Sequence, residues 1–336
     1  MRPPAEAAAR DIPDVVAWSW AEARAHLEAA GWTVRRRHTA DARLPAGHRA
    51  SERVIAVRPD GDGVEVVTAD FPDGPAETPR GAEAADGPPE GDGLPRHVAV
   101  IMDGNRRWAR RHGTDTDTGH RAGVVSLRGV VRVCSDLGIG YLTCYAFSTE
   151  NWKRSRNEVD GLWALALEFL RTELPELVRR GVRVRVIGDR RGLPLLVRQA
   201  AAAAEAATAR NGGLVLTLAL NYGARQEIAA AARALCEDVA AGRLRPEAVD
   251  EAALAARLEM AGTPDPDLLI RTSGERRISN FLLWQIAYSE IWLTDALWPD
   301  FGEAQLRSAI EDYRRRDRRF GGGAAEPAGP QPASRG

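Results

Sequence analysis

The stretch His97-Val-Ala-Val-Ile-Met-Asp-Gly-Asn-Arg-Arg-Trp-Ala-Arg-Arg111 decides the interpretation of this 336-residue chain. Its β-branched start predicts a short strand, which ends at Asp103, and a helix then begins near Asn105. The backbone amides of Gly104, Asn105 and Arg106 would lie at the helix N-terminus, where unpaired N–H groups and the helix dipole attract an anion. Because Asp103 can hold a divalent cation beside them, the combination suits a magnesium-bound phosphate. Alone, the same residues are also typical of an ordinary turn.

The composition indicates an ordinary globular protein, with 44% hydrophobic and 28% charged residues. The net charge of −1 provides no overall attraction for nucleic acid or anionic membrane, so phosphate recognition would need local arginine clusters. Cys134, Cys144 and Cys236 lack metal-ligand spacing, and we expect reduced core residues. No apolar run approaches the roughly 18–20 residues that span a bilayer, and the N-terminus lacks a signal-peptide pattern. We therefore expect a cytoplasmic protein.

The chain divides into four parts. Residues 1–71 form a small α+β module with an expected helix over 19–30 and strands over 32–36, 53–58 and 64–69. Residues 72–95 read as a linker, with 6 prolines, 5 glycines and 6 acids. Residues 96–322 form the main domain, and 323–336 a disordered tail. The pattern over 12–34 weakly resembles the PASTA module, whose extracellular members engage cell-wall fragments; the alternative is an accessory module that docks or stabilises.

Alternating apolar and amphipathic runs in residues 96–322 predict an α/β fold, with a mostly parallel sheet of about six strands covered by helices. We expect strands near 97–102, 141–147, 182–187, 214–220, 267–271 and 290–294, and helices near 119–137, 157–180, 194–210, 224–241 and 303–319. Each of the first five strands ends in a polar cluster. Because the carboxyl ends of parallel strands share one edge, these clusters predict a single ligand site.

The segment that follows the fifth strand is suited to a diphosphate. Arg271 and Arg277 supply two guanidinium groups, Ser279 a hydroxyl, and Gly274 permits close backbone approach. The alternative is that Glu275 simply pairs with these arginines at the surface. The chain has no P-loop and no G-x-G-x-x-G after a strand, and it lacks the Asp-Asp-x-x-Asp cluster of trans-type isoprenoid synthases.

These residues resemble the cis-prenyltransferases, the family of undecaprenyl diphosphate synthases. Five stretches match in order: 97–109, 119–123, 145–154 with Glu158, 221–223, and 271–284 continuing to Glu290 and 298–301. The resemblance implies a homodimeric α/β enzyme with a hydrophobic tunnel, Mg²⁺ as cofactor, and successive addition of isopentenyl diphosphate to an allylic diphosphate with formation of cis double bonds. The product would be a cell-wall lipid carrier precursor or a shorter isoprenoid, which makes peripheral membrane association an option for this cytoplasmic enzyme.

The resemblance also implies residue roles. Asp103 would be the metal-linked carboxylate at the allylic diphosphate, and Glu290 a second one brought near through the dimer contact. Asn151 would help to position the proton lost from isopentenyl diphosphate, and Arg271, Arg277 and Ser279 would clamp its diphosphate. Further substrate-binding residues would be Gly104, Asn105, Arg106, Arg107, Trp108, His120, Ser148, Thr149, Glu150, Trp152 and Arg154.

The main departure from the family pattern is Thr116, which stands where members usually carry an arginine that reaches the allylic diphosphate. We therefore expect weaker binding, or a different choice, of allylic substrate; compensation by Arg110 or Arg111 is the alternative. Trp163 would shorten the product if it pointed into the tunnel, and otherwise it packs in the core. Two other functions remain open, namely a non-catalytic partner subunit and the irregular coupling of dimethylallyl units.

Overall fold

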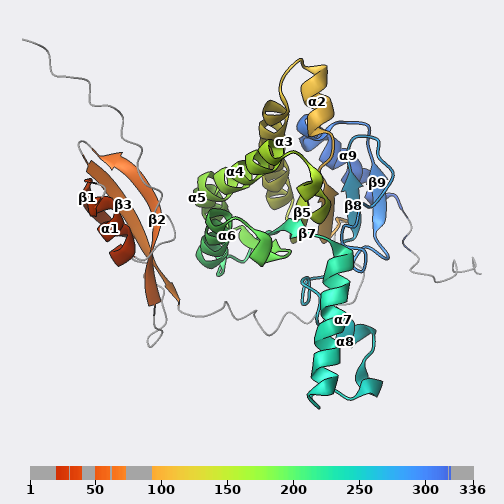
Figure 1. Cartoon of the computed structure of the whole chain (residues 1–336). Helices are drawn as coiled ribbons and strands as arrows, with labels where there is room; N and C mark the ends of the chain where they lie inside the picture. Colours follow the sequence, from red (N-terminus) through yellow and green to blue (C-terminus); the bar gives the residue numbers. More distant parts are fainter. Residues whose placement is uncertain are drawn as a thin grey trace, which may run out of the picture.

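The computed structural model describes residues 20–29, 31–39, 50–60, 63–72, 93–316 and 318 (Figure 1). The N-terminal part contains helix α1 (Trp20–Ala29) and strands β1 (Thr33–Thr39), β2 (Ala50–Asp60) and β3 (Gly63–Pro72). Strand β3 lies in the middle of this sheet, parallel to β1 and antiparallel to β2. One helix and three strands occur where the sequence predicts them, and the strands are longer than expected. Most of the expected linker and all of the expected tail lie outside the described residues.

The main sheet has six parallel strands in the order β6-β7-β5-β4-β8-β9. Their bounds are β4 His97–Ile101, β5 Tyr141–Ser148, β6 Arg183–Ile187, β7 Val215–Tyr222, β8 Leu268–Arg271 and β9 Glu290–Leu293. Each strand lies within two residues of its predicted bounds. The predicted α/β class is confirmed.

The helices of this domain are α2 Asn105–Arg111, α3 Thr116–Asp136, α4 Arg156–Thr172, α5 Leu174–Arg179, α6 Leu195–Thr208, α7 Ala224–Ala240, α8 Glu251–Ala255 and α9 Glu303–Arg314. The prediction of one helix over 157–180 is wrong, because the chain breaks into α4 and α5. Pro175 stands in the first turn of α5. Proline has no N–H to donate and its ring clashes with the preceding turn, so a helix restarts there.

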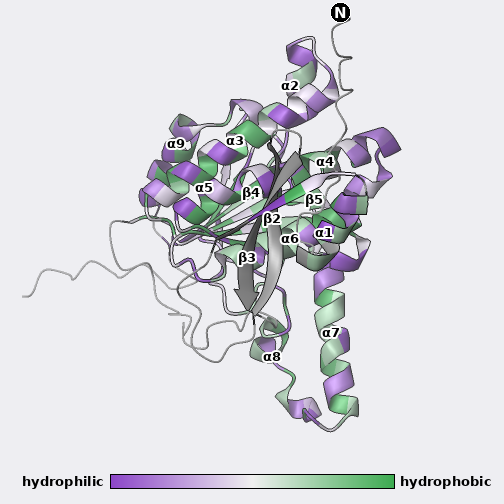
Figure 2. Ribbon diagram, turned by 90° about the vertical axis from the view of Figure 1, so that its left-hand side faces the viewer, coloured by the Kyte–Doolittle hydropathy of each residue, from purple (hydrophilic) through white to green (hydrophobic). Residues whose placement is uncertain are grey.

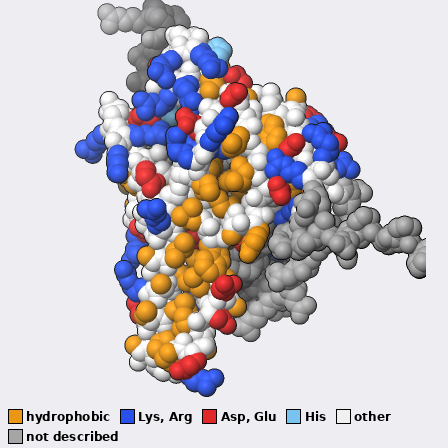
Figure 3. Space-filling model, turned by 90° about the vertical axis from the view of Figure 1, so that its right-hand side faces the viewer, with side chains coloured by type: hydrophobic (Ala, Val, Ile, Leu, Met, Phe, Trp, Pro, Cys, Tyr) orange, Lys and Arg blue, Asp and Glu red, His pale blue; other side chains and the backbone are white. Residues whose placement is uncertain are grey.

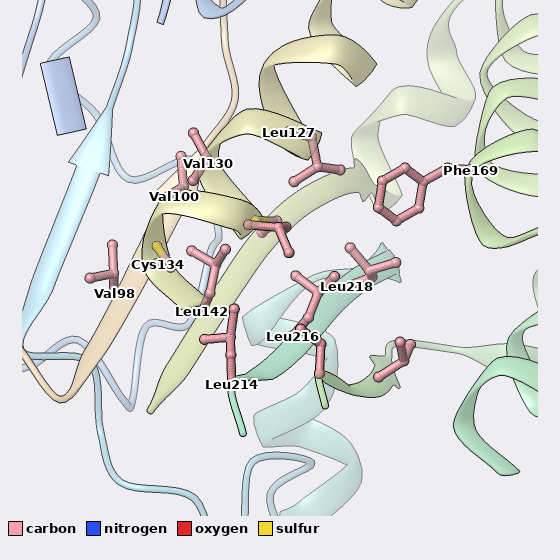
Figure 4. Packing of buried hydrophobic residues seen from close by; sticks show 14 of the residues in the cluster. Val98, Val100, Leu127, Val130, Cys134, Leu142, Phe169, Leu214, Leu216 and Leu218 are labelled. Carbon is pink, nitrogen blue, oxygen red and sulfur yellow. The ribbon is translucent and has the colours of Figure 1, made fainter. Parts of the chain in front are cut away.

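The larger hydrophobic core covers one face of the sheet (Figure 4). Even-numbered residues of β4 and β5 point to this face, where side chains of α3, α4, α6 and α9 cover them. Cys134 and Cys144 lie in this core, whereas Cys236 is exposed, so the expectation that it is a core residue is wrong. Residues of the opposite strand face, such as Ile101 and Tyr145, enter a smaller core together with Phe281 and Ile286.

The domain has two distinct ends. The hydrophilic α2 lies at one end, and α7 and α8 extend from the other (Figures 1 and 2). No helix among the described residues is both long and apolar enough to cross a bilayer.

His97 ties together three parts of the sheet region. It is fully buried at the start of β4, its Nδ1 lies 2.7 Å from the Pro264 carbonyl oxygen, and its Nε2 lies 2.8 Å from Thr143 Oγ1. Because a carbonyl only accepts, Nδ1 carries the proton and Nε2 accepts from the hydroxyl. Burial lowers the pKa of His97 to about 4, so the ring is neutral in the native protein.

This buried histidine predicts acid sensitivity. Below pH 6.5 the ring gains a proton in the unfolded chain but not in the folded one, so its contribution to the free energy of unfolding is complete above pH 6.5. That contribution is lost as the pH falls towards 4, by about 3 kcal/mol in total. Urea unfolding at pH 7 and pH 4 should show that the free energy of unfolding depends less on pH in His97→Asn than in the wild-type protein. An unchanged slope would show that His97 is not responsible.

Candidate active site

The candidate site lies where the chain order of the sheet reverses. From β4 the chain proceeds to β5 on one side, and only after β7 does it return to place β8 on the other side of β4. The segments that follow β4 and β8 are tied together, since the Asp103 amide donates to Thr272 Oγ1 at 2.9 Å and that hydroxyl lies 2.6 Å from the Asp103 carbonyl oxygen. In parallel sheets, ligands bind in the crevice at such a point.

An acid and an arginine meet in this crevice. Arg271, at the end of β8, donates from Nη2 to Asp103 Oδ2 at 2.8 Å and from Nη1 to Ser279 Oγ at 2.8 Å. The Arg271 side chain is only 3% exposed, whereas that of Asp103 is 30% exposed. The buried guanidinium thus needs its carboxylate partner, while the carboxylate remains open to a ligand.

The clamp expected after β8 is partly assembled. Ser279 accepts a hydrogen bond from Arg271, but the Arg277 guanidinium is largely exposed and pairs with Glu275. Glu275 also lies 3.1 Å from Arg107, which donates to the Ser273 carbonyl at 2.8 Å. The surface pairing considered as the alternative therefore exists in this chain, alongside the Arg271–Ser279 hydrogen bond.

Strained backbone is concentrated in the loop over residues 273–282, which follows β8. Ser273, Ser279, Asn280 and Leu282 all have positive φ, as does Gly274. Such conformations cost free energy in residues other than glycine and persist where the surroundings hold them, often at functional sites. Gly274 has a φ of 73°, and a Cβ there would stand 2.6 Å from Asp295 Oδ1, so any other residue would be strained and would displace that carboxylate.

Helix α2 begins as the sequence predicts. Gly104 is its N-cap with φ of 115°, and a Cβ there would stand 3.0–3.1 Å from Leu297 and Ser273. No side chain in the described part of the chain caps this N-terminus, so the first amides of the helix are available to an anion. Arg106 is exposed on the same helix.

The Gly-His-Arg-Ala-Gly motif explains how α3 supports α2. A Cβ on Gly119 would lie 2.4 Å from the Asn105 carbonyl oxygen, and one on Gly123 would lie 2.6 Å from Asn105 Oδ1. The two glycines, four residues apart, therefore form a flat surface on which α2 rests. His120 between them is 3.2 Å from Asn105 Nδ2.

His120 is buried beside a charged pair. Glu158 Oε1 lies 3.5 Å from its Nε2 and accepts a hydrogen bond from Arg154 at 2.8 Å. Burial, reinforced by Arg154, lowers the pKa of His120 and outweighs the opposing effect of Glu158. Because Asn105 Nδ2 can only donate, Nδ1 of the neutral ring is the acceptor and Nε2 carries the proton.

Three buried polar atoms at this site, namely Asn105 Oδ1, His120 Nε2 and Arg271 Nε, have no hydrogen-bond partner among the described residues. Buried polar atoms are usually satisfied, so such a group is typical of a site that is completed by a ligand.

The short 3-10 helix Thr149–Lys153, termed the 149–153 turn below, follows Ser148 at the end of β5. Asn151 Oδ1 accepts from the Ser148 amide at 2.9 Å, so this side chain holds the turn closed. Trp152 donates to Asn221 Oδ1 at 2.7 Å. The structure thus brings the predicted residues Ser148, Asn151 and Trp152 to the same edge of the sheet as Asp103.

An apolar cavity of about 100 Å³ lies beside these polar groups, between the sheet, α3 and α4. Its lining includes Asn105 and His120 at the polar side and Phe147, Trp163, Phe169 and Leu220 in the apolar part. Trp163 is 4% exposed and stacks on Phe147 with ring centroids 4.1 Å apart. The cavity lies where the predicted tunnel would run, and Trp163 lines it.

Some predicted residues lie apart from the cavity. Trp108 donates to Asp300 at 2.7 Å and stacks on His112, outside the cavity lining. Glu290 begins β9 at the opposite edge of the sheet from Asp103 and pairs with Arg316 at 2.8 Å. Thr116 is the first residue of α3, and exposed Arg110 and Arg111 have no acid partner among the described residues.

Thr272 and the asparagines Asn221 and Asn280 were missed as site residues. Each belongs to a motif that the sequence singles out, at the end of β7 or β8. Their side-chain bonds depend on the positions of distant loops, which the local pattern does not reveal.

Fold and site together define a class of enzyme that handles an anionic group beside an apolar chain. Comparison with known proteins names it. Residues 101–321 match the family model described as "Putative undecaprenyl diphosphate synthase". A ditrans,polycis-undecaprenyl-diphosphate synthase of Xanthomonas axonopodis is 54% identical over 68% of this chain and 89% of its own length. The chain therefore belongs to the undecaprenyl diphosphate synthase family and is a prenyltransferase.

Two further proteins are similar to this chain. An isoprenyl transferase of Heliobacterium mobile is 54% identical over 68% of this chain and 88% of its own length. The crystal structure of lavandulyl diphosphate synthase from Lavandula x intermedia, in complex with dimethylallyl diphosphate, has a TM-score of 0.67 and 42% identity, and covers 68% of this chain and 99% of its own.

Trp163 is expected to limit product length, because its indole occupies the cavity wall. Replacement by alanine should lengthen the products by one or more isoprene units, measured by chromatography after dephosphorylation. The change should also lower the free energy of unfolding by about 3–5 kcal/mol. Leu142→Ala, a buried substitution outside the cavity lining, is the control and should leave product length unchanged. Unaltered products of Trp163→Ala would place the growing chain elsewhere.

Proposed function

We propose that this enzyme condenses isopentenyl diphosphate with an allylic diphosphate to give a cis-polyprenyl diphosphate, for instance the precursor of a cell-wall lipid carrier. The observation that carries the proposal is the Asp103–Arg271 pair at the carboxyl ends of β4 and β8, next to residues that line an apolar cavity. Charged groups there suit two diphosphates, and the cavity suits the hydrocarbon chain.

The reaction requires a diphosphate to leave and a proton to be lost. The allylic carbon–oxygen bond breaks with its electron pair on the departing diphosphate, and the double bond of isopentenyl diphosphate supplies the new carbon–carbon bond. The proton then leaves the isopentenyl unit. The α2 amides, Asn105 and Arg107 would hold the allylic diphosphate, and Arg271, Arg277 and Ser279 the isopentenyl diphosphate.

Asp103 fits a Mg²⁺ ion that arrives with substrate. The described residues include no cluster of three or more His, Cys, Asp or Glu side chains able to hold a metal. Mg²⁺ commonly binds through one or two carboxylates together with substrate phosphates, and Asp103 is partly exposed for that purpose. When bound, the ion would neutralise charge on the departing diphosphate.

Proton handling would fall to polar groups next to the cavity. His120 lines the cavity and is neutral, and its Nε2 has no hydrogen-bond partner among the described residues, with Glu158 Oε1 3.5 Å away. Asn151 would serve once its bond to the Ser148 amide rearranges on substrate binding. Thr149, Glu150 and Trp152 in the same turn, with Ser148 and Arg154 on either side of it, would close over the substrates.

We further propose a homodimer formed through the edge strand β9. Ile291 and Leu293 on this strand are exposed, as is Tyr288 before it. Hydrophobic side chains also spread over the middle and lower part of the face seen in Figure 3. An unpaired apolar edge strand needs a cover, and pairing of two copies would bring the partner's β9 region, with Glu290, towards the site.

The enzyme would work in the cytoplasm, in peripheral contact with the membrane that takes up its lipid product. Arg106, Arg110 and Arg111 are exposed on α2, which contains no acidic residue. Such a basic surface attracts anionic lipid headgroups.

The test of the function is product analysis with labelled isopentenyl diphosphate, Mg²⁺ and separate dimethylallyl, geranyl, farnesyl and geranylgeranyl primers. We expect a ladder of cis-polyprenyl products, and a loss of at least 100-fold in kcat for Asp103→Ala with the fold retained. Folded wild-type protein that incorporates no label with any primer would contradict the proposal and favour a non-catalytic partner subunit.

Irregular coupling is the second candidate, because of the similarity to lavandulyl diphosphate synthase. Incubation with dimethylallyl diphosphate alone separates the two functions. A branched ten-carbon product would favour irregular coupling.

The dimer is tested by substituting Leu293, which is 41% exposed on β9. Leu293→Asp would bury a charge in the proposed contact, so it should shift the protein to monomers at micromolar concentration in sedimentation velocity. The matched control is Val178→Asp on α5, where Val178 is 42% exposed. A monomeric wild-type protein, or equal behaviour of both variants, would exclude this interface.

A further inference from the structure

Two asparagines with left-handed backbone hold the 149–153 turn from opposite sides. Asn221 is the penultimate residue of β7 and has a φ of 53°, and Asn280 follows Ser279 with a φ of 62°. Asparagine adopts this conformation more readily than most residues, although at some cost. Both side chains donate or accept hydrogen bonds with the turn.

Asn221 fixes the position of Trp152. Its Oδ1 accepts from the indole N–H at 2.7 Å, while its Nδ2 donates to the Asp189 carbonyl at 3.0 Å. Asn221 is buried, and a Cβ on Gly192 would stand 2.5 Å from its Nδ2. The amide is therefore locked in one orientation, because both of its ends are bonded and a glycine makes room for it.

The Trp152 ring in turn packs against the cavity wall. Its centroid lies 5.3 Å from that of Phe147 and 5.6 Å from that of Trp163, and both of those residues line the cavity. Trp152 itself is 43% exposed. The hydrogen bond to Asn221 thus helps to hold this half-exposed ring on the aromatic side chains that the hydrocarbon chain would meet.

Asn280 holds the other part of the turn. Its Nδ2 donates to Glu150 Oε1 at 3.0 Å, and its Oδ1 accepts from the Arg225 amide at 2.8 Å. A Cβ on Gly223 would lie 2.8 Å from both Asn280 Nδ2 and Thr149 Oγ1, so glycine lets the three segments meet. Because Asn280 directly follows Ser279 of the diphosphate clamp, it connects that clamp to the turn.

We propose that Asn221 and Asn280 are positioning residues with separate tasks. Asn221 holds Trp152 against the cavity wall and thereby governs turnover and product length. Asn280 holds Glu150 beside the clamp and thereby governs binding of isopentenyl diphosphate. The two kinetic roles rest on the proposed function. The statement that the two asparagines hold the 149–153 turn in place is independent of that function.

The Asn221 task is tested with glycine and phenylalanine substitutions. Asn221→Gly removes the side chain and relieves the positive φ, while Trp152→Phe removes only the indole donor and keeps a ring. Each should lower kcat about fivefold and change the product distribution, with KM for isopentenyl diphosphate unchanged within about twofold. The double variant should be no worse than either single one, because both remove the same bond. Fully additive losses would overturn this task.

The Asn280 task predicts the opposite kinetic division. Asn280→Gly should raise KM for isopentenyl diphosphate about fivefold and leave kcat and product length within about twofold. Combination with Glu150→Gln should again be non-additive. Equal effects of the Asn221 and Asn280 variants on KM and kcat would overturn the separation of tasks.

Hydrogen exchange of the full chain without substrate tests the holding of the turn independently of activity. Amides of the 149–153 turn should exchange at least threefold faster in Asn221→Gly and Asn280→Gly. Asn211→Gly is the matched control. Asn211 Nδ2 donates to the Val182 carbonyl oxygen at a distance of 2.7 Å, and this bond does not involve the turn. Unchanged exchange in both turn variants, or equal acceleration in the control, would overturn the proposal. If the two turn variants exchange faster but the wild-type protein shows no turnover, only the proposed function is refuted.

Discussion

The parallel pairing of β4 with β8 is the constraint on which the site depends. It places the residues that follow the two strands side by side, so that Asp103 and Arg271 lie 2.8 Å apart although 168 positions separate them in the chain. A buried guanidinium is stable only with a partner, and a partly exposed carboxylate meets that need while keeping a face for ligands. Stability of the ligand-free protein and readiness for a metal-bound diphosphate are therefore properties of the same pair.

The cavity depends on a second constraint, the close approach of α2 to α3. Gly119 and Gly123 let α2 rest directly on α3, and this contact brings Asn105 and His120 to the polar side of the cavity. Large side chains at these two positions would push α2 away and separate the anion-binding amides from the apolar wall. Charge recognition and hydrocarbon binding thus meet because two positions lack side chains.

Local pattern was sufficient to predict most of the fold. Apolar runs such as that of β4 lie in a sheet buried on both faces, so their burial leaves a clear signal in the sequence. Pro175 indicates a helix break in the sequence, but the apolar periodicity continues across it and favours the single helix that we predicted. For the site, the polar ends of strands predicted Asp103 and Arg271, since parallel strands share one edge. The Thr272 tether and the Asn221–Trp152 bond could not be predicted, because they depend on rotamers and on the relative placement of distant loops.

Glu275 shows how the ligand-free site balances its own charge. It pairs with both Arg107 and Arg277, which belong to the two diphosphate positions of the proposed reaction. Because these ion pairs are partly exposed, each contributes little to stability and can be exchanged at small cost. A diphosphate offers more charge and more acceptor oxygens than one carboxylate, so it would displace Glu275 from the arginines. Glu275, which neutralises both arginines in the absence of ligand, therefore yields them only to a ligand of higher charge.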